Sequence, residues 1–264
     1  AGFERLAASG DGIHAEHIDS LVKDIKNDSN IEFVGKKALE VVSTGFNAGD
    51  SYGEVWIRDY NTFIELALEV HDEEDLRENI LIFFKFQGDD GNIIDGFIPV
   101  DQADGGYDYI YSDLEPRFAG HKNTVETDQE TSLIQTVFKY IERTGDTGLL
   151  DEKVGRYTVA ERMLMAIGFL KTHRFNDQYG LIWGATTADW GDVQPEHEWG
   201  VFLTEDSHYA IDIYDNAMLL IALDNMAEML PSRSEELLEL HGTISSNAMD
   251  HLWDEKEQKF IPHI

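Results

Sequence analysis

The segment from Trp183 to Val193 combines two indoles with two carboxylates and has no regular hydrophobic period. Its indoles are Trp183 and Trp190, and its carboxylates are Asp189 and Asp192. Indole faces stack on the apolar faces of sugar rings, and a carboxyl group between two indoles is partly desolvated, which raises its pKa towards that of a general acid. These residues indicate a carbohydrate site. The alternative is a loop whose tryptophans anchor it in the core and whose aspartates cap the next element.

Asp189 and Asp192 stand close together in one loop, so both would approach a substrate from the same side. Hydrolysis of a glycosidic bond with inversion needs an acid and a base that flank the bond, roughly 6.5 to 9.5 Å apart. We therefore expect one of the two aspartates to be the acid and the other to support it.

Composition restricts the partners of the chain. It has 264 residues, of which 42% are hydrophobic, enough for one large core or two modest ones. Its formal net charge of -32 repels both a phosphate backbone and an anionic membrane, so we expect neither nucleic acid nor a membrane as partner. No cysteine is present, which excludes thiol catalysis and cysteine-ligated zinc. The first residues lack the pattern of a signal peptide, and a cytoplasmic, periplasmic or extracellular location stays open.

Apolar residues at helical spacing dominate the chain and predict an all-α fold with almost no strand. Seven or eight helices are indicated, with apolar faces over residues 18–25, 34–42, 63–68, 76–84, 133–141, 163–170, 218–230 and 237–252. Gly145 ends the fifth of these helices, and Pro231 stops the seventh.

Two connections, residues 88–127 and 175–214, are far longer than is usual between helices, and long ordered loops often carry function. No Pro/Ser-rich linker divides the chain, so residues 1–264 are predicted to form a single domain. The acidic run 89–96 lacks the pattern of an EF-hand, and we interpret it as a solvated turn. His121, His197 and His208 show no spacing typical of metal ligands, and no phosphate-binding loop occurs, so we expect no metal and no cofactor.

Four short motifs, spread over residues 56–229, resemble the six-hairpin glycosidases. Residues 56–60 (Trp-Ile-Arg-Asp-Tyr) look like the aromatic-x-Arg-Asp entry of this (α/α)6 barrel group, which includes glucoamylases, glycogen-debranching glucosidases and processing α-glucosidases. Residues 190–192 (Trp-Gly-Asp) are similar to the Trp-x-Asp segment of the debranching-type members, whose aspartate is the general acid. Residues 214–218 and 226–228 resemble the helix that follows this acid, and residues 126–128 resemble a sugar-binding corner.

The resemblance implies a glycoside hydrolase that acts on an oligo- or polysaccharide. It favours an exo-acting, inverting α-glycosidase with Asp192 as general acid and Asp189 beside it. Such a barrel has twelve helices, commonly with the second carboxylate near the carboxyl end. We therefore expect the barrel to be truncated in this chain, with the base beyond residue 264.

The expected substrate-binding residues are Trp56, Arg58, Asp59, Asp128, Trp183, Trp190 and Asn216. A guanidinium and a carboxylate offer fixed donors and acceptors to sugar hydroxyls, although Arg58 and Asp59 could also be a helix-start ion pair. Three functional alternatives stay open: a glycoside phosphorylase, an unsaturated uronyl hydrolase on the same toroid, or a non-catalytic carbohydrate-binding helical protein. The oligomeric state is open as well.

Overall fold

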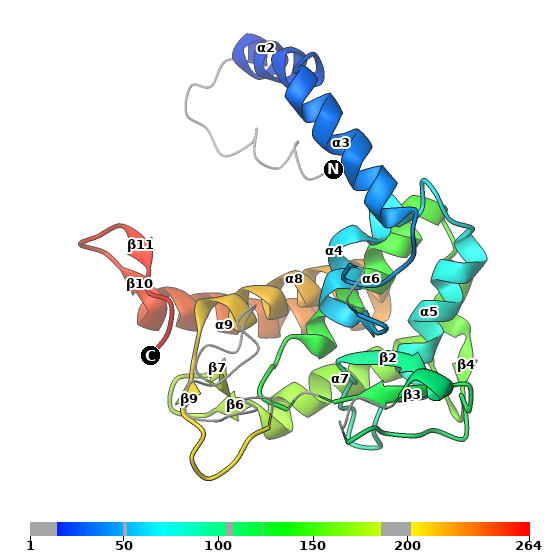
Figure 1. The fold of residues 1–264 in the computed structure, drawn as a ribbon. Coiled ribbons are helices and arrows are strands. Elements are labelled where there is room, and N and C mark those ends of the chain that lie inside the picture. The colour runs from blue at the N-terminus through cyan, green and yellow to red at the C-terminus, as the bar shows by residue number, and fades with distance from the viewer. Residues whose placement is uncertain (1–14, 50–51, 104–107, 123, 186–201) are drawn as a thin grey trace.

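The structure, a computed structural model, describes residues 15–49, 52–103, 108–122, 124–185 and 202–264. The α-helices in these ranges are α2 (Ala15–Lys26), α3 (Ser29–Val42), α4 (Ile57–Ala67), α5 (Glu73–Lys85), α6 (Gln129–Thr144), α7 (Val159–His173), α8 (Ile213–Met229) and α9 (Ser234–Leu252). Each of them contains one of the expected apolar faces. The all-α prediction is therefore confirmed, with helices in the predicted order (Figure 1).

Local residue choices explain where several helices begin and end. Thr158 and Glu161 form a capping box at the start of α7, and Asp212 caps α8 by accepting the amide of Asp215. Gly145 ends α6 in the left-handed region at φ 76°, where its N–H bonds the carbonyl of Ile141, as the sequence predicted. Three short 3-10 helices accompany the longer ones: η1 (Val100–Gln102), η2 (Thr147–Asp151) and η3 (Pro231–Arg233).

Alternate helices pack against one another. Helix α4 packs on α6, and α6 packs on α8, so these three form an inner row. Helices α5 and α7 also pack on α6, and α9 covers α8, which makes an outer layer. Because α6 has neighbours on several sides, most of its residues are buried, including the polar Gln129, Glu130 and Gln135. The inner row therefore has a buried polar interior at the start of α6.

Short strands lie in the two long connections and elsewhere between the helices, where the sequence predicted almost none. Strands β1 (Val55–Trp56), β2 (Gly96–Pro99) and β3 (Phe118–His121) form an antiparallel sheet in the order β1-β2-β3. Two-stranded ladders pair β4 (Lys153–Val154) with β5 (Tyr157–Thr158), β6 (Phe175–Asn176) with β7 (Leu181–Ile182), β8 (Gly184–Ala185) with β9 (Tyr209–Ala210), and β10 (Trp253–Asp254) with β11 (Lys259–Phe260). Strands of two to four residues are too short to show a period of two in the sequence.

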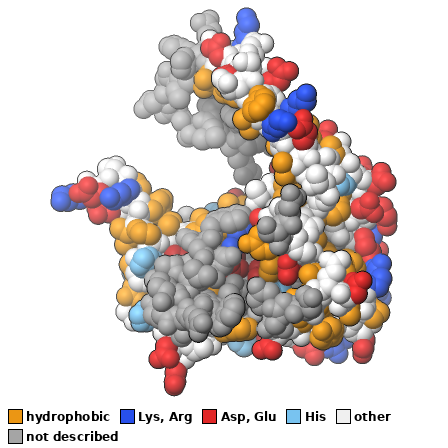
Figure 2. Space-filling view, in the orientation of Figure 1, with side chains coloured by type: hydrophobic (Ala, Val, Ile, Leu, Met, Phe, Trp, Pro, Cys, Tyr) orange, Lys and Arg blue, Asp and Glu red, His pale blue; other side chains and the backbone are white. Residues whose placement is uncertain are grey.

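Helices α2 and α3 extend away from the rest of the described chain (Figure 1), and α3 packs on the start of the inner row at α4. The apolar face predicted for α2 is exposed at Leu21, Val22 and Ile25. The face predicted for α3 is exposed at Val34 and becomes buried at Val42, where α3 meets the core. No helix in the described ranges is both long and apolar enough to cross a membrane. Figure 2 shows acidic side chains dispersed over the described part of one face, as expected for a solvated surface.

Candidate functional site

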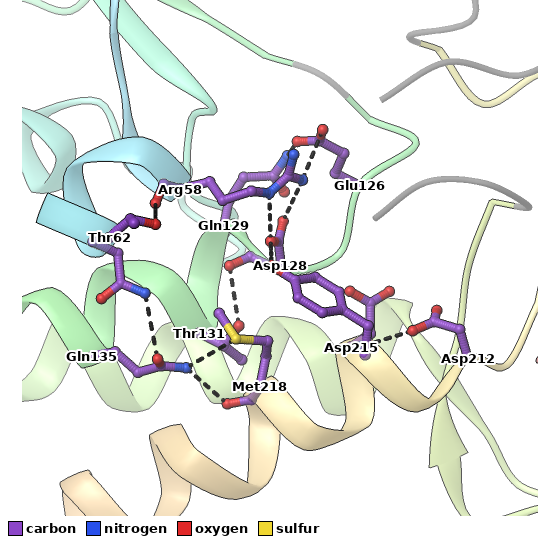
Figure 3. Close-up of polar contacts among 12 residues, drawn as sticks. Arg58, Thr62, Glu126, Asp128, Gln129, Thr131, Gln135, Asp212, Asp215 and Met218 are labelled. Carbon is purple, nitrogen blue, oxygen red and sulfur yellow. Dashed lines mark hydrogen bonds and ion pairs between the residues drawn. The ribbon is translucent and has the colours of Figure 1, made fainter. Parts of the chain in front are cut away.

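The amino-terminal ends of the three inner helices meet in a group of polar residues, here named the Arg58 cluster. Its members are the buried Arg58, Glu126, Asp128 and Asp215 (Figure 3) and the half-buried Tyr214. Arg58 lies in the first turn of α4. Its Nε donates to Asp128 Oδ2 at 2.7 Å and its Nη2 to Asp128 Oδ1 at 2.9 Å, while Nη2 also lies 2.8 Å from Glu126 Oε1. Tyr214, in the first turn of α8, donates its hydroxyl to Asp128 Oδ2 at 2.8 Å. Asp128 thus joins α4, α6 and α8.

Burial decides the electrostatics of Arg58. Desolvation disfavours its charged form, but hydrogen bonding and attraction from Asp128, followed by Glu126, outweigh desolvation and raise its pKa. Burial and the charge of Asp128 also raise the pKa of Tyr214, which keeps its phenol protonated and able to donate. The cluster therefore combines a permanent cation with fixed acceptors and a neutral hydroxyl.

Asp215 is the carboxyl group of this cluster that favours the protonated form. It is buried, and burial first, then the charges of Asp212 and Asp128, raise its pKa well above the ordinary range. A Cβ atom placed on Gly184 would lie 2.9 Å from Asp215 Oδ2 and 3.2 Å from Thr127 Oγ1. Glycine therefore lets β8 approach the carboxyl group closely.

A second layer of hydrogen bonds holds Glu126 in place. Gln129 donates its Nε2 to Glu126 Oε2 at 3.0 Å and accepts from Lys122 Nζ at 3.2 Å. Lys122 also donates to the carbonyl of Ile93 at 2.7 Å, and the amide of Ile93 donates to Glu130 Oε1 at 2.9 Å. Burial lowers the pKa of Lys122 and raises that of Glu130. Glu126 is thus oriented by Gln129, which is itself fixed by a hydrogen bond from Lys122.

Trp56 is positioned by a row of residues across the β1-β2-β3 sheet. Trp56 pairs with Gly96, and Gly96 pairs with His121. Because the middle residue has no side chain, the rings of Trp56 and His121 meet across it, with centroids 5.0 Å apart at 87°. A Cβ atom on Gly96 would lie 2.7 Å from Trp56 Cε3. His121 Nδ1 in turn lies 3.4 Å from Asp95 Oδ2, and the Asp95 carbonyl accepts the amide of Ile57 at the start of α4.

Asn216 and Trp183 lie on the α8 side of the cluster. The Asn216 amide accepts from the Ile182 amide at 3.0 Å and donates to the carbonyls of Ile182 and Asp212 at 2.9 and 2.8 Å. It therefore fastens β7 to the start of α8. The carbonyl of Trp183 accepts from Thr127 Oγ1 at 3.1 Å. Thr127 stands between the two carboxylates that pair with Arg58, so this bond ties the β7–β8 segment to them.

The structure thus brings together Arg58 and Asp128, with Trp56 at the end of β1 and the half-buried Asp59 next to Arg58 on α4. Asp189, Trp190 and Asp192 lie outside the described residues, as does His197. Glu126, Tyr214 and Asp215 were not predicted as site residues from the sequence. All three nevertheless belong to motifs that resemble the six-hairpin glycosidases. Within the described ranges, no group of three or more histidine, aspartate or glutamate side chains is arranged to hold a metal ion.

The inner and outer rows define an all-α fold of the toroid type, and comparison with solved structures agrees. The chain is similar to a rhamnosidase from Klebsiella oxytoca with rhamnose bound, with a TM-score of 0.51 and 14% sequence identity. The match covers 86% of this chain and 40% of that one, so this chain spans less than half of the rhamnosidase. At this identity the likeness concerns the fold alone. No protein family and no curated protein matches the sequence.

Proposed function

We propose that this chain carries the sugar-binding part of a glycoside hydrolase site for an oligo- or polysaccharide. The observation that carries the proposal is the Arg58 cluster, in which one guanidinium is shared by two carboxylates where three inner helices begin. Support also comes from the fold, which the chain has in common with a rhamnosidase whose structure contains rhamnose.

The cluster has the chemistry needed to bind a sugar unit. Sugar hydroxyls both donate and accept, and Glu126 and Asp128 offer acceptors beside the donors of Arg58 and Tyr214. Because each of these groups is already held by a neighbour, little rotamer freedom is lost when a sugar binds. Trp56 adds an aromatic ring two residues before Arg58. The proposed exo-acting mode places the terminal sugar unit on this cluster.

The proposed reaction is inverting hydrolysis of an α-glycosidic bond. Asp192, with Asp189 as support, gives its proton to the glycosidic oxygen, and the bond from that oxygen to C1 breaks. A water oxygen bonds to C1 from the opposite face and its proton passes to a carboxylate base, which the proposal places outside these 264 residues. Asp189 and Asp192 belong to the connection between β8 and β9, and β8 lies against Asp215.

The experiment measures hydrolysis of p-nitrophenyl α-L-rhamnopyranoside and α-D-glucopyranoside by the full-length enzyme, which contains the proposed base, and by its variants. Asp192→Asn should lower turnover by about 10² to 10⁴-fold with an unchanged thermal melt, because a general acid contributes about that much. Asp206→Asn, an exposed residue of the same connection, is the matched control and should be silent. NMR of the first sugar released should show the anomer of inverted configuration.

Two outcomes would change the proposal. If Asp189→Asn abolishes turnover and Asp192→Asn retains it, the roles of the two aspartates are reversed. If sugars bind but neither glycoside is cleaved, the chain belongs to a carbohydrate-binding protein instead, for which a proton donor is not needed.

A further inference from the structure

A cavity of about 340 Å³ lies beside the β8-β9 ladder, and no expected site residue other than Trp183 takes part in it. Its lining includes the aromatic residues Tyr179, Trp183 and Tyr209 together with Asn176, Ile211 and Ile264. Small-ligand sites start at about 300 Å³ and are mostly apolar with a few polar groups. In size and lining, this cavity fits one ring-sized ligand.

The aromatic residues of the cavity are held in place by contacts of their own. The rings of Trp183 and Tyr209 meet edge to face, with centroids 4.8 Å apart at 75°. The guanidinium of Arg174 lies 4.9 Å from the centroid of the Trp183 ring, and the Tyr179 ring packs on His251 at 5.2 Å. Tyr209 is 58% exposed, so a ligand can reach it from solvent. The cavity is therefore preformed and accessible at Tyr209.

Consecutive residues connect this cavity to the Arg58 cluster. The side chain of Trp183 lines the cavity, whereas its carbonyl accepts from Thr127. The next residue, Gly184, lies against the carboxyl group of Asp215. The backbone of residues 183–184 thus lies next to both the cavity and the Arg58 cluster.

The lining also restricts the ligand. None of the described residues that line it has a charged side chain, and Asn176 is fixed because its Oδ1 accepts the amides of Gln178 and Tyr179. A uronate or a phosphorylated sugar would lose its hydration here without gaining a cation. A ring with an apolar face would stack on the aromatic residues.

We propose that this cavity is a second ring subsite, which takes the uncharged ring attached to the sugar held by the Arg58 cluster. The inference rests on the proposed function and narrows its substrate class to glycosides whose neighbouring group is a neutral ring with an apolar face. A pyranose ring and an aryl group share this chemistry.

Calorimetric titration with matched glycosides tests the subsite. The probes are methyl and phenyl α-L-rhamnopyranoside, methyl and phenyl α-D-glucopyranoside, and methyl α-maltoside, whose second ring is a sugar. The phenyl glycoside of the sugar that binds should bind about tenfold more tightly than its methyl counterpart, as expected for one aromatic contact. If methyl α-maltoside also binds more tightly than methyl α-D-glucopyranoside, the subsite accepts a pyranose ring. If only the phenyl glycosides bind more tightly than their methyl counterparts, the subsite accepts an aryl group.

Substitution of Tyr209 gives the matched variants. Tyr209→Ala should bring the phenyl glycoside to the affinity of the methyl glycoside and leave the latter unchanged, while Tyr209→Phe should keep the difference. Tyr111→Ala, which removes an exposed aromatic residue elsewhere, is the control. Because Tyr209 is exposed, none of these variants should unfold the protein, and thermal melts check this.

Equal affinities for methyl and phenyl glycosides in the unsubstituted protein, or a difference that survives Tyr209→Ala, would overturn the subsite. Failure of the proposed function gives another result: no glycoside is cleaved, and Arg58→Lys leaves the affinity for the methyl glycosides unchanged. The two proposals can therefore fail separately.

Discussion

The Arg58 cluster and a second network around Arg117 each pair a guanidinium with two carboxylates at nearly equal distances. Arg58 lies 2.7 and 2.8 Å from Asp128 and Glu126, and Arg117 lies 2.6 and 2.9 Å from Glu115 and Glu78. The Arg58 side chain is 8% exposed, whereas that of Arg117 is 62% exposed. The distances are similar in the two networks, and the Glu115 side chain is as buried as those of Glu126 and Asp128, so the burial of the arginine separates them.

Burial changes what an ion pair contributes. Water screens Arg117 and Glu78, and exposed pairs typically contribute about 0 to 1 kcal/mol. In the Arg58 cluster, the desolvation of three charges offsets much of their attraction, so the pairs are a poor source of net stability. Their effect is to fix donors and acceptors in one arrangement. That arrangement is costly to disturb and suits a site that must bind one ligand shape.

Removal of each arginine should give the largest contrast. Arg58→Met leaves Glu126 and Asp128 buried without their cation and should lower the free energy of unfolding by about 3 to 5 kcal/mol. Arg117→Met should cost about 1 kcal/mol or less, because Arg117 is exposed and Glu115 keeps its ion pair with Lys85. Urea denaturation of the two variants measures both values. Equal losses would mean that burial does not separate the networks.

Two glycines provide a smaller contrast between the site and the surface. Gly184→Ala should destabilise by about 1 to 3 kcal/mol, because its Cβ would lie 2.9 Å from Asp215 Oδ2 in a packed region. Gly168→Ala, at an exposed position of α7 with no atom within 4 Å of the added Cβ, should stabilise by about 0.5 to 1 kcal/mol. Thermal melts of the two variants show whether each substitution stabilises or destabilises the protein. Stabilisation by both substitutions would show that β8 does not press on the carboxyl group.

The sequence allowed the helices to be predicted because their apolar faces repeat along the chain. Gly145 also predicted the end of α6, because glycine readily adopts the left-handed backbone found there. The strands β1 to β3 were not predicted, since ladders of two to four residues have no detectable period and their pairing depends on residues far apart.

The site could be predicted only in part, for a similar reason. Arg58 and Asp128 belong to separate motifs, and the resemblance pointed to both. Tyr214 was missed because its partner Asp128 is 86 positions away, a contact that only the packing of α6 on α8 creates. Asn216 shows the converse: its motif suggested sugar binding, and the hydrogen bonds seen for its amide go to the backbone of Ile182 and Asp212.

The smallest expected effect concerns pH, to which the two networks respond in opposite directions. In the exposed network, hydrogen bonds from Arg117 outweigh desolvation and, with those from Lys85, lower the pKa of Glu115 from 4.5 to about 2. The carboxylate therefore contributes stability above pH 4.5, and this contribution is lost as the pH falls towards 2. In the Arg58 cluster, burial raises the pKa of Asp215, so the folded protein keeps a proton that the unfolded chain releases above about pH 3.8. Stability should then fall as the pH rises above that value.

Urea midpoints from about pH 2 to about pH 8 separate these contributions. Glu115→Gln should lower stability at neutral pH by about 1 kcal/mol at most, because its partner Arg117 is largely exposed, and should flatten the curve between pH 4.5 and about 2. Asp215→Asn should leave the loss of stability between pH 4.5 and about 2 unchanged. It should flatten the decline in stability above pH 3.8, since an amide does not titrate. An unchanged curve above that pH in Asp215→Asn would mean that folding does not raise the pKa of this carboxyl group. The Arg58 cluster would then hold its charges by some arrangement other than a protonated Asp215 beside Asp128.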